Sequence, residues 1–416
     1  MKIIYLIAGT YRAAGMERVL ANKANWLASR GYDVLIVTTD QRGREPAFRL
    51  DPSIRSVDLG INYEENNGGR FLNKVLHYPL KQWRHRRRLS ALLKAEKADV
   101  VVSMFCNDAA FLSSIKDGSR KVLEIHFSRF KRLQYGRKGL WALADRFRSR
   151  NDLRVVSRFD RFVVLTQEDR GYWEADAALP NICVIPNART FAPAVGHVAP
   201  SAGPGMPVAS PAALAVGPDV PAAQPSAPAV SSDSPDTTSS AGIVLAAGRY
   251  NAQKAFDRLI EVWKTVAPQA PGWKLRIAGD GELRQALQQQ IDAAGLHDSV
   301  ILGKAEGDIR DLYAAADIYA LTSLYEGLPM VLLEAQASGL PIVAMACKCG
   351  PRDVVTDGED GFFVPEGDNA AMADKLLELI NDPALRHRMG AAALRASDRF
   401  DEAAVMQRWT ALFRCQ

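Results

Sequence analysis

The sequence of 416 residues has no apolar run that approaches the roughly 18 residues needed to cross a bilayer. Cysteine is also scarce, because only five residues occur and none has the spacing of a zinc site. Even Cys347-x-Cys349 is too isolated for one. This cysteine usage predicts a reducing cytoplasm. The short run Ile3–Ala8 after Lys2 is read as a buried strand and not as a signal peptide.

Residues 191–240 lack Lys and Arg altogether and have no aromatic residue after Phe191. Ten of these 50 residues are Pro and 12 are Ala. Such a segment cannot bury enough apolar surface to offset the entropy of ordering it. We therefore predict a disordered Pro/Ala-rich interdomain linker over 191–241. A folded Ala-rich element is the alternative, and the recurring prolines disfavour it.

Two common ligand signatures are missing. No G-x-G-x-x-G fingerprint for a dinucleotide follows the first strand. No Asp-x-Asp pair occurs, the nearest pattern being Asp280-Gly-Glu282, and the histidines form no cluster. The sequence therefore predicts no bound metal and no cofactor.

The charge is unevenly distributed. Residues 1–190 carry 34 Lys and Arg against 20 Asp and Glu, a net charge of +14. Residues 241–416 carry 18 basic and 24 acidic residues, a net charge of −6. A basic first half and an acidic second half predict two modules with different partners.

Short apolar runs alternate with helical patterns in both halves, which is typical of parallel sheets covered on both faces. The predicted strands are Ile3–Ala8, Asp33–Thr38, Val100–Met104, Lys121–His126, Arg161–Leu165, Ile243–Ala247, Lys274–Ala278, Val300–Leu302, Ile318–Leu321 and Pro341–Ala344. We predict two Rossmann-like, doubly wound α/β domains, 1–190 and 242–400, that face a central cleft. The amphipathic residues 401–416 are predicted to form a helix that returns to the first domain.

A glycine-containing loop, Gly9 to Glu17, follows the first strand and opens a helix. Gly15 and Met16 stand at the helix start, where backbone N–H groups and the helix dipole favour an anion such as phosphate. An ordinary strand-to-helix turn explains the loop equally well.

Two cations, Arg249 and Lys254, follow the first strand of the second half. An Arg fork and a Lys point charge suit a diphosphate, although a solvated loop remains the alternative. Glu326-Gly327-Leu328-Pro329 precedes a predicted helix in which Glu334 lies about two turns along. The Gly327–Pro329 backbone can meet phosphate, and Glu334 can accept hydrogen bonds from two hydroxyls. Two surface carboxylates are the alternative.

His126 ends a predicted strand and would point into the cleft, unless it is a core histidine bonded to backbone. The basic run Lys81–Arg88 precedes Leu89, and Trp83 and the later leucines could form one apolar stripe on a basic helix. Such a helix suits anionic lipid headgroups, with a solvated helix as the alternative. No recognised nucleic-acid-binding module accompanies the charge, so nucleic acid is not a predicted partner.

Taken together, the motifs resemble glycosyltransferase family 4, the retaining GT-B enzymes that use nucleotide sugars. The resemblance rests on the set Gly15-Met-Glu-Arg-Val, Val184-Ile-Pro-Asn-Ala188, Gly248-Arg249 with Lys254, Ala278-Gly-Asp-Gly281, Glu326 to Glu334, and Gly350-Pro-Arg-Asp-Val-Val355 with Asp357-Gly-Glu-Asp-Gly-Phe-Phe-Val-Pro. It spans nearly the whole chain except 191–240. Met16 departs from the family, in which many members have Gly or Ala.

The resemblance implies roles for these residues. Arg249 and Lys254 would hold the donor diphosphate, Glu334 the ribose hydroxyls and Glu326 the transferred sugar. Gly15, Met16 and the Gly327–Pro329 backbone would complete the donor site. His126 would contact the sugar near the acceptor.

These roles predict a retaining, metal-independent transferase. A UDP-sugar is the expected donor, and GDP remains open. The acceptor would be a lipid-linked glycan of bacterial capsule, exopolysaccharide or lipopolysaccharide, reached at the inner face of the cytoplasmic membrane. A GT-B nucleotide-sugar epimerase or hydrolase and a non-catalytic nucleotide-sugar-binding protein are the alternatives.

Overall fold

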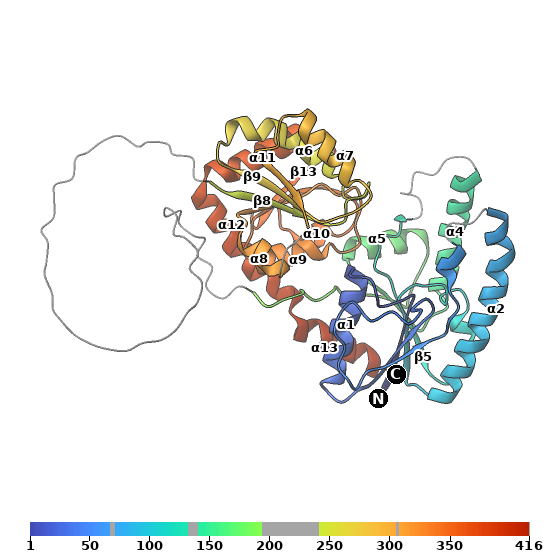
Figure 1. The fold of residues 1–416 in the computed structure, drawn as a ribbon. Coiled ribbons are helices and arrows are strands. Elements are labelled where there is room, and N and C mark those ends of the chain that lie inside the picture. Colours follow the sequence, from blue (N-terminus) through green and yellow to red (C-terminus); the bar gives the residue numbers. More distant parts are fainter. Residues whose placement is uncertain (67–70, 132–139, 194–240, 305–307, 416) are drawn as a thin grey trace, which may run out of the picture.

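The computed structural model describes residues 1–66, 71–131, 140–193, 241–304 and 308–415. Within them the chain forms two α/β domains, each a parallel sheet with helices on its faces (Figure 1). The prediction of two doubly wound domains is confirmed. The predicted linker falls mainly on 194–240, which lies outside the described residues.

The first sheet has the strand order β3-β2-β1-β4-β5-β6-β7, and every neighbouring pair is parallel. Its strands are β1 (Lys2–Ile7), β2 (Asp33–Thr38), β3 (Arg55–Asp58), β4 (Val100–Ser103), β5 (Arg120–Glu124), β6 (Arg161–Val164) and β7 (Ile182–Val184). The order reverses between β1 and β4. In doubly wound sheets ligands bind beyond the carboxyl ends of the strands at such a reversal.

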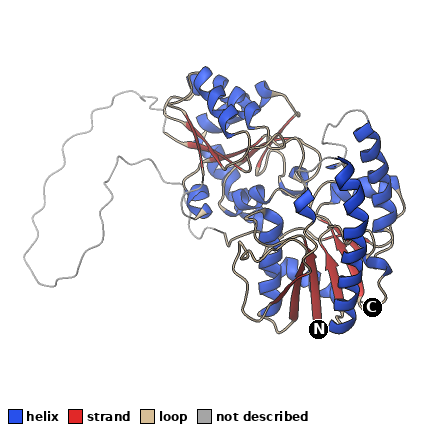
Figure 2. Cartoon of the chain, turned by 45° about the vertical axis from the view of Figure 1, so that its right-hand side comes forward, coloured by secondary structure: helices blue, strands red, loops and turns tan. Residues whose placement is uncertain are grey.

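The central strands of this sheet are apolar on both sides because helices cover both faces. These are α1 (Gly15–Ala28), α2 (Phe71–Glu96), α4 (Leu140–Val156) and α5 (Gln167–Asp176), with short 3₁₀ turns η1 (Tyr63–Asn66) and η2 (Leu112–Ser114). Leu89 and Leu93 of α2 pack in one apolar layer, whereas Leu20 and Leu27 of α1 pack in the other. In Figures 1 and 2, α2 and α4 stand together at the outer edge of this domain.

The second sheet has the order β10-β9-β8-β11-β12-β13, also all parallel. Its strands are β8 (Ile243–Ala247), β9 (Lys274–Ala278), β10 (Val300–Gly303), β11 (Ile318–Leu321), β12 (Ile342–Met345) and β13 (Gly361–Val364). Its helices are α6 (Phe256–Val266), α7 (Arg284–Ala293), α8 (Ile309–Ala314), α9 (Met330–Ala337), α10 (Pro351–Val354), α11 (Asn369–Asn381) and α12 (Pro383–Ala396), with turns η3 (Ala267–Gln269) and η4 (Ser397–Phe400). This order reverses between β8 and β11.

The last helix, α13 (Glu402–Arg414), leaves the second domain and lies beside α1 on the first one (Figure 1). Asp401 caps it by accepting hydrogen bonds from the backbone N–H groups of Ala403 and Ala404. Its apolar face, with Met406, Trp409 and Phe413, is buried in the same layer as α1. The end of the chain is therefore part of the core of the first domain.

Three strands were not predicted from the sequence. Strand β3 is a sheet edge with three of its four residues exposed, so its apolar signal is weak. Strand β7 has three residues, and β13 begins at Gly361 beside the exposed loop that precedes it. Among the described helices, none is both long and apolar enough to cross a membrane.

Candidate active site

Two helix N-termini meet where the domains face each other. Helix α1 begins at Gly15 and helix α9 begins at Met330, and neither has a side chain that caps its first turn. A Cβ atom added at Gly15 would lie 3.9 Å from the Met330 side chain. Met16, the next residue of α1, packs at the edge of the apolar layer behind it. Two uncapped helix starts leave backbone N–H groups free at one place, which suits an anionic ligand.

The loop after β8 carries both predicted cations. Arg249 is exposed, whereas Lys254 is largely buried, with its side chain 15% exposed. The Lys254 Nζ atom lies 2.6 Å from Oε1 of Glu326 and donates a hydrogen bond to it. Gln253 supports this pair by donating to the carbonyl of Tyr325, next to Glu326, at 2.9 Å. The structure thus brings together Lys254, which was predicted to hold a diphosphate, and Glu326, which was predicted to contact the sugar.

Glycines bring the loops of this site close together. A Cβ on Gly248 would lie 2.8 Å from the Lys254 side chain, and φ at Gly248 is +154°. A Cβ on Gly327 would lie 2.6 Å from the carbonyl oxygen of His126 in the first domain. A larger residue at Gly327 would push the two domains apart at the predicted donor site.

The Gly327–Pro329 segment leads directly into α9. Leu328 and Pro329 are buried, and Pro329 is the residue before the helix. Since Pro fixes its own φ near the helical value, it sets the direction in which α9 starts. Glu334 is the fifth residue of this helix, so it lies just over one turn from its start. The expected distance of about two turns was too long.

Glu334 is buried, with 5% of its surface exposed. Burial raises its pKa, and hydrogen bonds from two hydroxyls oppose that rise. Tyr313 donates to Oε2 and Thr190 donates to Oε1, each at 2.8 Å. Glu334 was predicted to accept hydrogen bonds from two hydroxyls of a ligand, and its present donors are two hydroxyls of the protein. Neither Tyr313 nor Thr190 was predicted from the sequence. Thr190 belongs to the segment that leaves the first domain, so it links that segment to the predicted nucleoside site.

His126 lies two residues beyond the end of β5, not at the end of the strand as predicted. The strand ends at Glu124 because the pairing of β5 with β6 stops there. The His126 Nε2 atom lies 3.1 Å from Oε1 of Glu124, which is fully buried. Glu17 of α1 is also buried, and burial raises its pKa against the nearby charges of Arg12, Arg249 and His126. Neither Glu124 nor Glu17 was predicted as a site residue, although for Glu124 a charged residue inside an apolar strand is a usable signal.

Further along the cleft the second domain caps a helix of the first. The Asp353 carboxylate accepts hydrogen bonds from the backbone N–H groups of Gln167 at 2.7 Å and Glu168 at 3.3 Å, at the start of α5. Nearby, the Cys349 thiol lies 3.2 Å from the Ser128 hydroxyl. These contacts fix the relative position of the two domains beside the predicted site.

The predicted basic helix forms, but its apolar stripe was wrong. Leu89 and Leu93 of α2 are buried in the core, whereas Trp83 is 58% exposed on another side of the helix. The Arg88 side chain is tied to the first domain, since its Nη1 group donates to the backbone carbonyls of Leu59 and Gly60. Three more basic residues of this half, Arg132, Arg137 and Lys138, lie outside the described residues.

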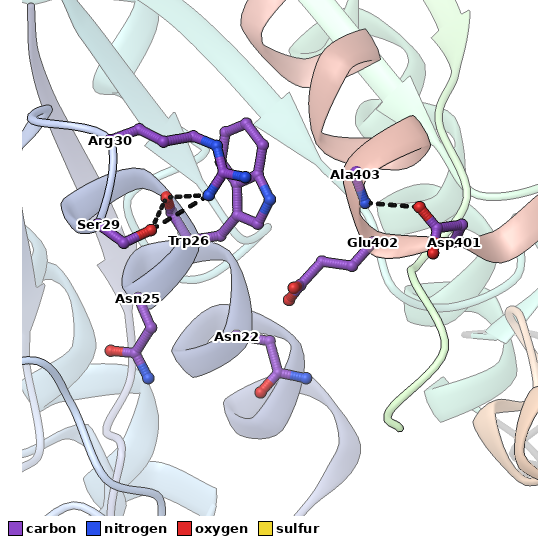
Figure 3. Close-up of a pocket in the computed structure, with 8 residues that line it drawn as sticks. All are labelled: Asn22, Asn25, Trp26, Ser29, Arg30, Asp401, Glu402 and Ala403. Atoms are coloured by element: carbon purple, nitrogen blue, oxygen red, sulfur yellow. Dashed lines mark hydrogen bonds between the residues drawn. The ribbon is translucent and has the colours of Figure 1, made fainter. Parts of the chain in front are cut away.

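No group of three His, Cys, Asp or Glu side chains that could hold a metal ion occurs in the described parts of the chain. A polar cavity lies between α1 and the start of α13, and Asn22, Trp26, Arg30 and Glu402 are among its lining residues (Figure 3). None of the predicted site residues lines this cavity.

The sequence matches two families, one in each half. Residues 13–189 match the family described as Glycosyltransferase Family 4, and residues 232–396 match Glycosyl transferases group 1. The chain is 26% identical over 420 residues to the amylovoran biosynthesis glycosyltransferase AmsD of Erwinia amylovora, covering 98% of each chain. It is 33% identical over 153 residues to the lipopolysaccharide core biosynthesis glycosyltransferase LpsE of Rhizobium meliloti, covering 37% of this chain and 44% of that protein.

The fold is similar to that of TarM from S. aureus, solved as a single-residue mutant with fondaparinux, alpha-GlcNAc-glycerol and UDP. The TM-score is 0.69 at 16% sequence identity, and the similarity covers 100% of both chains.

Proposed function

The chain belongs to the GT-B glycosyltransferases of family 4, and from this premise we propose that it transfers a sugar, with retention, from a UDP-sugar to a lipid-linked glycan. It is a glycosyltransferase of surface polysaccharide biosynthesis, as the relatives AmsD and LpsE indicate. The UDP donor is supported by TarM, whose structure contains UDP.

The observation that carries the proposal is the meeting of α1 and α9 beside Lys254. The first turns of α1 and α9 have no side-chain cap, and Lys254 is largely buried. The exposed Arg249 belongs to the same loop as Lys254. Together these groups form a positively charged environment for a diphosphate. Breaking the sugar–phosphate bond places negative charge on the leaving diphosphate. Cations already in place stabilise that charge as it develops, so the chemistry proposed here needs no metal ion.

The second domain would hold the rest of the donor. Glu334 would accept hydrogen bonds from the ribose hydroxyls in place of one of its present partners, Tyr313 and Thr190. Glu326 would contact the transferred sugar, with Gly327 and Leu328 offering backbone N–H groups. His126 belongs to the first domain and lies where the two domains meet, and it would act on the acceptor side. We assign no covalent nucleophile, and retention would follow from attack on the same face as departure.

The acceptor would reach the first domain from an anionic membrane surface. Helix α2 exposes Leu80 and Trp83 next to Arg84, Arg86 and Arg87, and α4 exposes 69% of Phe147 between Arg146 and Arg148. Apolar side chains flanked by cations suit the boundary between headgroups and acyl chains. Each basic residue near such a surface contributes about 1 kcal/mol. The chain would then work at the inner face of the cytoplasmic membrane as a peripheral protein.

The donor is tested by thermal-shift screening against UDP, GDP and their sugars, followed by transfer assays with and without EDTA. A ligand at 100 times its Kd adds about 2.7 kcal/mol of stability. We expect stabilisation by UDP and its sugars, transfer that survives EDTA, and a product whose anomeric proton coupling matches that of the donor. Stabilisation by GDP alone, loss of transfer in EDTA or an inverted product would each contradict the corresponding part of the proposal.

The membrane surface is tested by co-sedimentation with vesicles that contain phosphatidylglycerol. We expect binding that weakens with salt and that R84S/R86S/R87S and W83S/F147S each reduce. The matched control is K274S/R388S/R395S, which removes three exposed charges from the second domain. Equal binding by all four proteins would remove this surface as the membrane contact.

A further inference from the structure

A charged pair is buried inside the apolar layer between the first sheet and α1. Glu124, the last residue of β5, is 0% exposed, and Lys23 of α1 is 4% exposed. The Lys23 ammonium donates a hydrogen bond to Oε1 of Glu124. Removing two charges from water costs several kcal/mol per ion, and apolar residues of the same size often pack there at no loss of stability. Stability alone therefore does not account for this pair.

The same carboxylate oxygen faces His126. Residues 124 and 126 point to one side of the extended backbone, whereas Ile125 between them packs in the opposite apolar layer. Burial would raise the pKa of Glu124, but the contacts with Lys23 and His126 outweigh burial and hold this pKa below its usual range, which favours the ionised carboxylate. This carboxylate oxygen lies 3.1 Å from Nε2, close enough for an electrostatic contact that holds the imidazole ring against the buried pair.

On its other side, the Lys23 ammonium packs against the C-terminal helix α13. Its Nζ atom lies 4.0 Å from the centre of the Trp409 ring on α13 and 5.9 Å from that of Tyr5 on β1. Trp409 is 1% exposed, so this cation–π contact is shielded from water. The contacts therefore run from α13 through Lys23 and Glu124 to His126, whose carbonyl touches the Gly327 loop of the second domain.

We propose that the buried Lys23–Glu124 pair positions the His126 imidazole for the acceptor step, and that Trp409 of α13 holds this pair in place. The proposal rests on the proposed transferase function. Glu124, Lys23 and Trp409 are positioning residues, because they act through His126 and do not reach the cleft themselves. The end of the chain thereby supports the active site of the first domain.

The test is the double variant K23M/E124Q, which replaces both charges by neutral side chains of similar size. We expect a fall of at least tenfold in kcat, with the donor KM and Tm close to those of the wild type. The matched control is D117N/K121M, because Asp117 and Lys121 form another buried ion pair at the opposite end of β5. It is expected to leave kcat unchanged. W409F, which weakens the cation–π contact, should lower kcat severalfold.

Two further measurements separate positioning from a general loss of structure. In an H126A background, K23M/E124Q should cause no additional fall in kcat, because both changes remove the same contribution. The histidine NMR spectrum has only six residues to assign, and the His126 signals should shift in E124Q and stay in place in D117N/K121M.

The possible failures can be told apart. If H126A is impaired and K23M/E124Q keeps full kcat, the inference is overturned and the transferase function stands. If the wild type transfers no sugar from any nucleotide donor, the proposed function is overturned, and the NMR shifts still decide whether the pair positions His126. Additive effects of H126A and K23M/E124Q would also overturn the inference.

Discussion

The Nζ atom of Lys254 lies 2.6 Å from Oε1 of Glu326 although 72 residues separate them in the chain. The pair joins the two halves of the proposed donor site, since one residue is assigned to the diphosphate and the other to the sugar. With both side chains largely buried, each neutralises the other before a donor binds. A donor that brings a diphosphate to Lys254 would free Glu326 to face the sugar.

Replacing Lys254 or Arg249 by Ala should lower kcat by about 10²–10³-fold, because each change removes a charge that stabilises the leaving diphosphate. The effect on stability should differ between them. K254A leaves a buried carboxylate unpaired and should lower Tm, whereas R249A changes an exposed side chain and should not. R388A, at an exposed Arg of the same domain, is the control. Full activity of both K254A and R249A would contradict the diphosphate assignment.

Replacing Glu334 by Gln should raise the KM for the donor about tenfold or more, since hydrogen bonds to a charged acceptor contribute about 1.5–3 kcal/mol. The ribose assignment is tested with a donor that lacks the 2′-hydroxyl. This donor should bind the wild type more weakly than the natural one, and E334Q should discriminate much less between the two. Equal discrimination by wild type and E334Q would show that Glu334 does not contact the ribose.

Asp108 should make the protein less stable as the pH rises. It is 2% exposed, and burial raises its pKa to about 6, above the ordinary value near 4. Between these values the folded state binds more protons than the unfolded state, so stability is lost as the pH increases from about 4 to 6. A shift of this size corresponds to roughly 3 kcal/mol. In urea unfolding, D108N should gain stability over the wild type by about that amount between pH 4 and pH 7.5.

The control for this measurement is D298N, because the Asp298 side chain is 93% exposed. Its stability should follow the wild type across the same pH range. If the unfolding free energies of D108N and the wild type change in parallel with pH, Asp108 titrates normally in the folded protein.

Deleting most of residues 195–238 should leave transfer and Tm nearly unchanged, provided that enough chain remains to join Pro193 to Ala241. The segment carries no basic residue and none of the site motifs. Each halving of a flexible connection changes its closure free energy by only about 0.6 kcal/mol. A Tm many degrees below that of the full chain would show that the segment packs on the domains.

Much of the fold could be predicted from the sequence because its signals are local. Strands β2, β8, β9 and β11 have the bounds that hydrophobic patterning predicted. Apolar runs of four to six residues between helical patterns indicate buried parallel strands, whatever the rest of the chain does. The motifs of the proposed site are local too, since Arg249, Lys254 and Glu326 follow strands or precede a helix. The edge strand β3 was missed because an exposed edge has no such pattern.

The sequence by itself thus determined two parallel-sheet domains and a family, and it predicted the residue types of a donor site. Only the tertiary structure decided which of those residues meet. It paired Lys254 with Glu326, placed Thr190 against Glu334, and joined Lys23, Glu124 and Trp409 behind His126. It also turned Leu89 inward and left Trp83 outside on one helix. Such contacts depend on strand order, on how the helices rotate against the sheets and on how the domains meet, and local periodicity does not encode these.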